Sequence, residues 1–119
     1  MAMVIEHERD NVYRLDVRGM LRKVDLDRCQ DLLAAEISRL GRVRLLFVLD
    51  HFEGWEPQDT WNDLTFYAKH GHAIERIAIV GHDRWRAHTL MFAGADLRQG
   101  PVEYFGEDAL ADARAWLTT

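Results

Sequence analysis

The sequence predicts a single α/β domain, built on a mixed, mostly parallel sheet of about five strands with helices packed on it. Segments with the two-residue period of strands alternate along the chain with longer segments that have the 3.6-residue period of helices. Their order is β-β-α-β-α-β-α-β-α, and strands that alternate with helices imply parallel pairing through right-handed crossovers. The length of 119 residues, with 48% hydrophobic residues, suits one domain, which we expect to span residues 1–119.

The first two strands are expected to form a hairpin. Residues 3–8 can alternate as a strand, and Asp10 and Asn11 form a turn signal. Residues 12–18 then alternate cleanly between apolar and charged side chains, as in a strand with one buried face. The hairpin is expected to end at Gly19 and to place an antiparallel strand at one edge of the sheet.

A helix and a central strand follow the hairpin. Apolar residues recur at helical spacing over residues 26–40, with Asp25 as the expected N-cap and Gly41 at the expected C-terminus. Residues 43–49 are almost continuously apolar, which is typical of a strand covered on both faces. Residues 50–55 are expected to leave this strand as a loop.

The second half of the chain repeats this alternation of helix and strand. Pro57 suits the first turn of a helix, and Pro101 suits the start of a strand. We expect a helix over residues 58–70, a strand over 76–80, a helix over 84–93, a strand over 102–105 and a final helix opened by residues 106–108.

Composition and charge exclude several classes of function. The net charge of −5 argues against a nucleic-acid partner, because phosphate binding requires clustered Lys and Arg. The longest apolar run, residues 45–49, is far shorter than the ~20 residues of a membrane-spanning helix. Residues 1–10 lack the apolar region of a signal peptide, and the single cysteine, Cys29, fits a reducing compartment. We therefore expect a cytoplasmic protein without an integral membrane segment.

Two acids and two histidines are expected to meet at the carboxyl end of the sheet. Asp50 and His51 follow one predicted central strand, and His82 and Asp83 follow the next. Open α/β sheets bind ligands at such ends. These side chains could bind a divalent metal or perform acid–base chemistry. Alternatively, Asp83 could cap the third helix while Asp50 orders its own loop.

Tryptophans gather near the same two strand ends. Trp55, Trp61 and Trp85 lie on or just after the two loops, where they could line a binding surface or cover a small core. Arg86 follows Trp85 and could hold a carboxylate in a bidentate pair. Residues 89–93 are apolar nearly all round and could face a ligand or a partner subunit. The candidate ligand- or partner-binding residues are Asp50, His51, Trp55, Trp61, His82, Asp83, Trp85 and Arg86.

Several local strings resemble the SpoIIAA-like family of the STAS-type fold. They are Val48-Leu49-Asp50 followed by Gly54-Trp55, Ile77-Ala78-Ile79-Val80-Gly81 followed by Trp85, and the ending from Tyr104-Phe105 to Trp116-Leu117. The resemblance implies a small cytosolic domain without catalytic activity. Better-known relatives are anti-sigma-factor antagonists, which are switched by phosphorylation of a serine at the start of a helix after a central strand. Relatives in architecture, the CRAL-TRIO domains, bind lipids.

The serine of that switch has no counterpart here. The only serine is Ser38, near the C-terminal end of the first predicted helix. Residues 50–57, which form the corresponding loop, contain no hydroxyl side chain, and the nearest one is Thr60. The phosphorylation switch is therefore not carried over from the family.

These observations predict a cytosolic, non-enzymatic binding or interaction module without a cofactor. Its strand-end rim is expected to bind a protein partner or a small apolar-anionic ligand. One alternative is a regulator of the anti-sigma-factor-antagonist type that lacks the switch serine. Another is a small metal-dependent enzyme using Asp50, His51, His82 and Asp83. A homodimer is the expected oligomer, because twofold dimers are the most common assembly.

Overall fold

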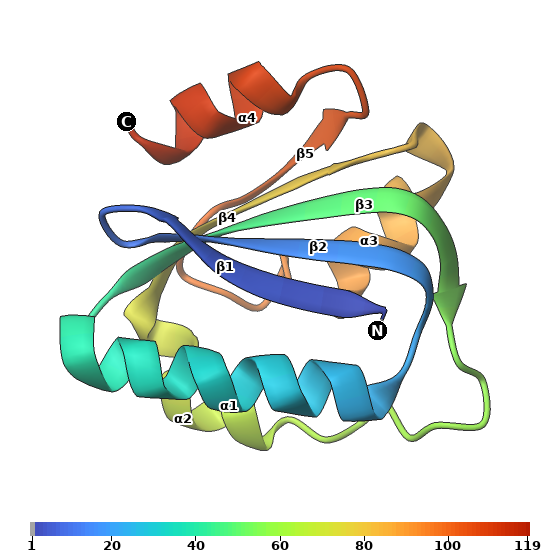
Figure 1. Cartoon of the computed structure of the whole chain (residues 1–119), viewed down its shortest axis with the longest axis horizontal. Helices are drawn as coiled ribbons and strands as arrows, with labels where there is room; N and C mark the ends of the chain where they lie inside the picture. The colour runs from blue at the N-terminus through green and yellow to red at the C-terminus, as the bar shows by residue number, and fades with distance from the viewer. Residues whose placement is uncertain (1) are drawn as a thin grey trace.

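The computed structural model describes residues 2–119 and shows one sheet with helices on both faces (Figure 1). Within these residues the sheet has five strands in the order β1-β2-β3-β4-β5. Strand β1 (Met3–Arg9) runs antiparallel to β2 (Val12–Leu21). Strands β3 (Val43–Trp55), β4 (Ile74–Gly81) and β5 (Val102–Gly106) continue the sheet in parallel. The predicted fold class and element order are confirmed.

Within residues 2–119, three α-helices pack on one face of the sheet and one packs on the other, as can be followed in Figure 1. The first face carries α1 (Lys23–Leu40), α2 (Thr65–His70) and α3 (Arg86–Phe92), and the second carries α4 (Leu110–Leu117). Each crossover advances by one strand in the same direction, so right-handed connections place all three crossover helices on the same side. Two short 3₁₀ turns, η1 (Gly71–Ala73) and η2 (Asp83–Trp85), flank β4.

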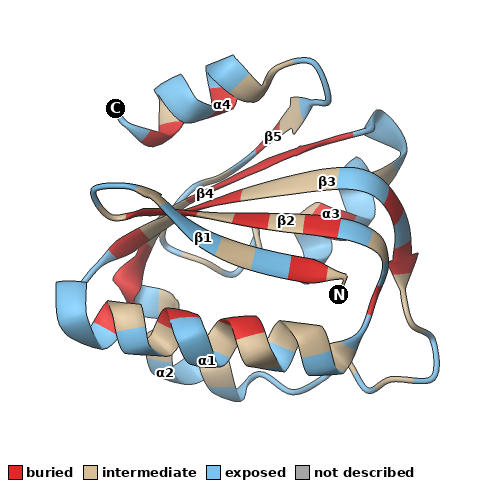
Figure 2. Cartoon of the chain, viewed as in Figure 1, coloured by how far each residue is buried: buried red, intermediate tan, exposed pale blue. Residues whose placement is uncertain are grey.

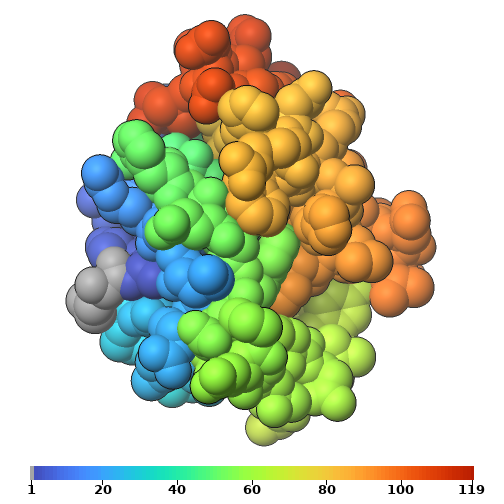
Figure 3. Space-filling view, turned by 90° about the vertical axis from the view of Figure 1, so that its right-hand side faces the viewer, coloured from blue at the N-terminus to red at the C-terminus, as the bar shows by residue number. Residues whose placement is uncertain are grey.

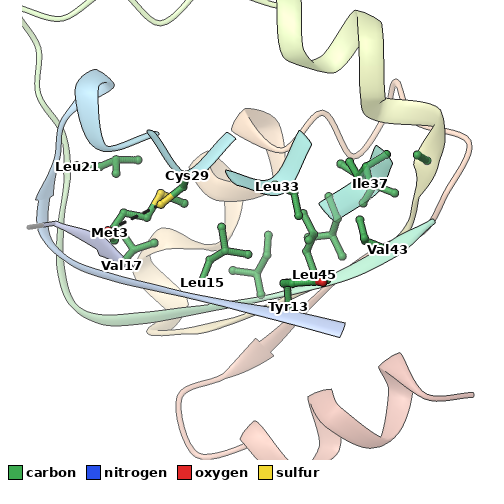
Figure 4. Close-up of a cluster of buried hydrophobic side chains, with 14 of the residues drawn as sticks. Met3, Tyr13, Leu15, Val17, Leu21, Cys29, Leu33, Ile37, Val43 and Leu45 are labelled. Atoms are coloured by element: carbon green, nitrogen blue, oxygen red, sulfur yellow. Dashed lines mark hydrogen bonds between the residues drawn. The ribbon is translucent and has the colours of Figure 1, made fainter. Parts of the chain in front are cut away.

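The alternation of side chains along the strands builds a core on each face. Leu15, Val17 and Leu45 point from the sheet toward α1 and pack with buried side chains of that helix (Figure 4). The intervening residues, such as Leu46 and Ala78, are fully buried beneath α4 on the opposite face. In Figure 2 the buried residues accordingly follow the middle strands and the inner side of α1. Helix α2 contributes no buried residue.

A polar contact joins the sheet to α1 at the edge of the larger core. The hydroxyl of Tyr13, which is buried, donates to Oε1 of Glu36 at 2.7 Å. The guanidinium of Arg39 donates to both oxygens of the same carboxylate. Hydrogen bonds from Arg39 and from Tyr13 lower the pKa of Glu36 to about 2.

Strand β3 is longer than predicted. Residues 50–55 were expected to form a loop, but they continue the strand and pair with Arg18–Leu21 through two register shifts. Positive φ angles at His51 (53°) and Gly54 (105°) interrupt the regular alternation of side chains. These irregular residues therefore lack the two-residue period that identifies a strand in sequence.

The second helix is much shorter than predicted, because residues 58–64 are not helical. The Asp59 carboxylate accepts hydrogen bonds from the backbone N–H of Lys23 at 2.9 Å and from Nε of Arg22 at 3.1 Å. The indole Nε1 of Trp61 donates to the carbonyl of Glu56 at 2.9 Å. These contacts hold the segment as a turn and coil against the start of α1, so the prediction of a helix from residue 58 is wrong.

The remaining boundaries differ by a few residues. Helix α1 begins at Lys23 with Arg22 rather than Asp25 at the N-cap, and Gly41 ends it as expected, with φ of 85°. The predicted third helix is divided into η2 and α3. Strands β2 and β4 are each longer than expected, and α4 begins at Leu110.

Replacing Gly81 by alanine should destabilise the fold. A Cβ there would lie 2.8 Å from the Tyr104 hydroxyl oxygen and 2.9 Å from Cδ1 of Leu49. Such overpacking should lower the free energy of unfolding by about 1–3 kcal/mol, measured by urea denaturation. Gly106, paired with Gly81 across the β4–β5 ladder, is the matched control, because a Cβ there would meet nothing within 4 Å. Equal stability of the G81A and G106A variants would contradict this packing.

The Tyr13–Glu36–Arg39 contact should contribute to stability at neutral pH and fail in acid. Because the pKa of Glu36 is about 2 in the folded state and near its ordinary value of 4.5 when unfolded, its contribution is present above pH 4.5. It is lost as the pH falls from 4.5 toward 2, where the folded protein must also take up the proton. The E36Q variant should therefore show a shallower acid dependence of the unfolding free energy over this interval than the wild type. Parallel curves would refute the contact.

Candidate functional site

An apolar cavity of about 350 Å³ lies between the sheet and the three helices of the larger face. Phe47 and Leu49 form part of its floor, and both are only half-buried although they lie on the middle strand of the sheet. The roof includes Cys29 and Leu33 of α1. Because α2 has six residues and buries none of them, the space above the middle strand is not filled.

Exposed apolar side chains stand where the cavity meets the surface. Leu64, Met91 and Leu97 line the cavity and are also 66%, 75% and 82% exposed. Phe92, the last residue of α3, lines it as well and is less exposed. Of the apolar segment 89–93, Thr89 and Met91 to Ala93 are part of the cavity wall.

Aromatic rings close the cavity where β3 ends. The ring of Trp55 lies 5.1 Å from that of Phe52 and 5.2 Å from that of Phe92, measured between centroids. Trp61 lies 5.7 Å from Phe92. Trp85 packs on the outer side, 4.9 Å from Phe52 and 6.2 Å from Trp55. Trp55 and Trp61 therefore belong to the cavity wall, and Trp85 buttresses it from outside.

The polar rim predicted from the strand ends surrounds a different space. Asp50, His51 and His82 line an open hollow of about 500 Å³, and Trp85 is also part of its wall. Figure 3 shows this end of the molecule, with the green end of β3 between blue β2 and the amber residues that follow β4. Parallel pairing of β3 with β4 brings the two strand ends together, as the sequence predicted.

The rim side chains of Asp50, His51 and His82 form hydrogen bonds within the rim and its loops. The Asp50 carboxylate lies 2.7 Å from Nδ1 of His51 and accepts a hydrogen bond from Arg18 at 3.0 Å. Nδ1 of His82 accepts from the backbone N–H of Arg84 at 3.0 Å, so His82 rather than Asp83 caps the turn that precedes α3. These contacts give the rim a structural role in ordering its own loops.

Two of the predicted residues line neither space. Asp83 begins η2, and the Arg86 guanidinium lies 5.6 Å from the ring centroid of Tyr104.

Among residues 2–119, no three His, Cys, Asp or Glu side chains lie close enough together to hold a metal ion. Thr60 is exposed on the coil before α2, five positions ahead of the first helical residue, Thr65. The structure thus adds no support to the metal-dependent or phosphorylation-switched alternatives.

Sequence reasoning did not identify Arg98, which lines the cavity from the loop after α3. Its Nη2 donates to the carbonyl of Ile74 at 2.9 Å and to that of Gly71 at 3.4 Å, and its guanidinium lies 5.6 Å from the Tyr67 ring centroid. Burial lowers the pKa of this guanidinium. No pattern marked Arg98 in the sequence, because residues 93–101 have neither helical nor strand periodicity.

No helix within residues 2–119 combines the length and the apolar character needed to cross a membrane.

Comparison with known proteins places this geometry in a family. A profile of the SpoIIAA-like family matches residues 12–118. A similar solved structure is that of an uncharacterised protein from the DUF3478 family with a SpoIIAA-like fold, from Shewanella loihica PV-4. It is 24% identical, the TM-score is 0.71, and the similarity covers 98% of this chain and 92% of that one, which supports the shared fold. A search of curated proteins found no match. Since the profile spans nearly the whole sequence, the chain belongs to the SpoIIAA-like family, as the resemblance of its motifs predicted.

Proposed function

We propose that this protein is a non-enzymatic binding module whose apolar cavity holds a small apolar ligand. The cavity carries the proposal, because its volume of about 350 Å³ is sufficient for a small molecule. Its floor and roof consist mainly of aliphatic and aromatic side chains, which offer water few hydrogen-bond partners. An apolar molecule would restore the dispersion contacts that the empty space forfeits.

The opening of the cavity supports uptake from outside. Leu64, Met91 and Leu97 expose apolar surface next to the interior, so a ligand would meet apolar side chains at the opening. The segment that carries Leu64 is coil, and α2 beyond it has no buried residue. Few buried contacts hold this side of the cavity, which is the condition for local opening.

The proposal contains no catalytic step. Cys29 lies in the cavity wall, where burial raises the pKa of its thiol. A thiol held in the protonated form is a poor nucleophile and contributes apolar surface instead. Thr89, another wall residue, donates its hydroxyl to the carbonyl of Trp85 at 2.6 Å. Both groups are therefore engaged in maintaining the wall.

A protein partner at the rim is a second candidate. The hollow is open and includes Glu107 and Asp108 beside Asp50, so its wall carries acidic side chains in addition to those already paired. A partner with a basic surface would suit it. The expected homodimer stays a prediction, and native mass spectrometry would report the number of subunits together with any retained ligand.

Filling the cavity should abolish ligand binding. In the A93F variant a phenyl ring would project from the end of α3 into the cavity wall. The wild type should bind the neutral dye N-phenyl-1-naphthylamine at one saturable site, and A93F should bind it at least about tenfold more weakly, measured by dye fluorescence. A87F is the matched control, since Ala87 is exposed on the same helix and outside the wall. Binding that is equal in both variants, or absent from the wild type, would refute the cavity proposal.

Substitutions at the rim should leave dye binding unchanged. Asp50 and His82 line the hollow and not the cavity, so the D50A and H82A variants should bind the dye within about twofold of the wild type. The same fluorescence titration measures this, with circular dichroism as the check on folding. A strong loss of affinity in either folded variant would move the ligand site from the cavity to the rim.

A further inference from the structure

We infer that the ligand of the cavity is an apolar monocarboxylate, such as a medium-chain fatty acid, whose carboxylate pairs with the guanidinium of Arg98. The inference rests on the proposed function and adds the chemical class of the ligand and its orientation. The observation behind it is an unpaired, half-buried cation in the wall of an apolar cavity.

Arg98 has hydrogen-bonding capacity that the protein does not use. Its Nη2 donates to two backbone carbonyls, of Ile74 and Gly71, which carry no formal charge. Its Nε is buried and has no hydrogen-bond partner. Within residues 2–119, the only other buried side-chain nitrogen or oxygen without a partner is Nε1 of Trp55, which also belongs to the cavity wall. Unsatisfied buried donors are rare in folded proteins, and both of these lie around one cavity.

Some half-buried arginines of this chain, such as Arg14 and Arg44, have carboxylate partners, whereas Arg76 donates to the carbonyl of Trp116 and the hydroxyl of Thr119 instead. Arg14 and Arg44 have side chains only 23% exposed, and they pair with Asp16 and Glu75 at 3.0 and 3.2 Å. No carboxylate of residues 2–119 forms an ion pair with Arg98. A sheltered charge is costly when it is unpaired, so a ligand that brings the missing anion would gain affinity from this residue.

The other cation in the wall is already neutralised. Lys23 forms an ion pair with Asp27 on its own helix, and its Nζ lies 3.5 Å from the carboxylate of Asp63. Asp63 also lines the cavity, so the Lys23 region would repel a second carboxylate as much as attract it. Arg98 is therefore the position in the wall that favours a negatively charged group.

The strand register gives the orientation of the ligand. Arg98 is bound to Ile74, which pairs with Val43 at the start of β3, whereas Trp55 is the last residue of β3. Arg98 and Trp55 thus mark opposite ends of the cavity floor. With its carboxylate at Arg98, the ligand would extend its apolar chain along Phe47 and Leu49 toward the aromatic end.

Displacement of N-phenyl-1-naphthylamine by decanoate and by 1-decanol tests the inference, because the two ligands share a chain and differ in charge. In the wild type, decanoate should bind at least about tenfold more tightly than decanol. In the R98M variant, which keeps the apolar stem of the side chain, decanoate should lose this advantage while decanol binds within about twofold of the wild type. R84M is the control, because Arg84 lies over the Trp85 ring outside the cavity.

The possible results separate the two proposals. If the wild type binds both ligands equally, the carboxylate inference is overturned and the apolar cavity site stands. If R98M weakens both ligands alike, Arg98 has only a structural role and the inference again fails. If neither ligand nor the dye binds, the proposed function itself is refuted. The comparison within the wild type decides the matter even if R98M does not fold.

Discussion

The handedness of the crossover connections is the constraint on which the rest of this structure depends. Three successive crossovers, from β2 to β5, each move one strand along the sheet, so right-handed connections place α1, α2 and α3 on one face. Only α4, which follows the last strand, is free to cover the other. The larger face therefore has to be filled by one long helix and two short ones, and α2 and α3 have six and seven residues. The cavity is the part of that face that they leave uncovered.

The same arrangement explains the contrast between the two candidate sites. At the rim, charged groups from neighbouring loops meet in the presence of water and satisfy one another, as Arg18 and Asp50 do. Inside the cavity the long connection from α3 to β5 brings Arg98 beside the start of β4, where the nearby groups are backbone carbonyls. Low polarity strengthens every electrostatic interaction in that space. This contrast is the reason why the proposed ligand site is placed at Arg98 and not at the paired groups of the rim.

Much of the fold could be predicted from the sequence, because the periodic elements carry their own signal. The apolar stripe of α1 and the alternation of β2 are consequences of local geometry, and parallel pairing then brings Asp50 and His82 to one end of the sheet. The end of β3 and the coil before α2 could not be predicted in this way. His51 has a positive φ angle, and Trp61 is held by a hydrogen bond to Glu56, so tertiary contacts decide both segments. The cavity and Arg98 escaped prediction because empty space and unpaired charge are properties of the assembled structure.

The family membership gives these features a common interpretation. The resemblance that led to the family implies a switch serine after a central strand, and this chain has only Ser38, which is exposed on α1. The loop groups at the corresponding end of the sheet are internally paired, whereas the two unsatisfied buried donors, on Trp55 and Arg98, belong to the cavity wall. Unsatisfied buried polar groups are rare in folded proteins and lower their stability. These features are the basis on which we propose that a ligand binds in the cavity between the sheet and its three helices.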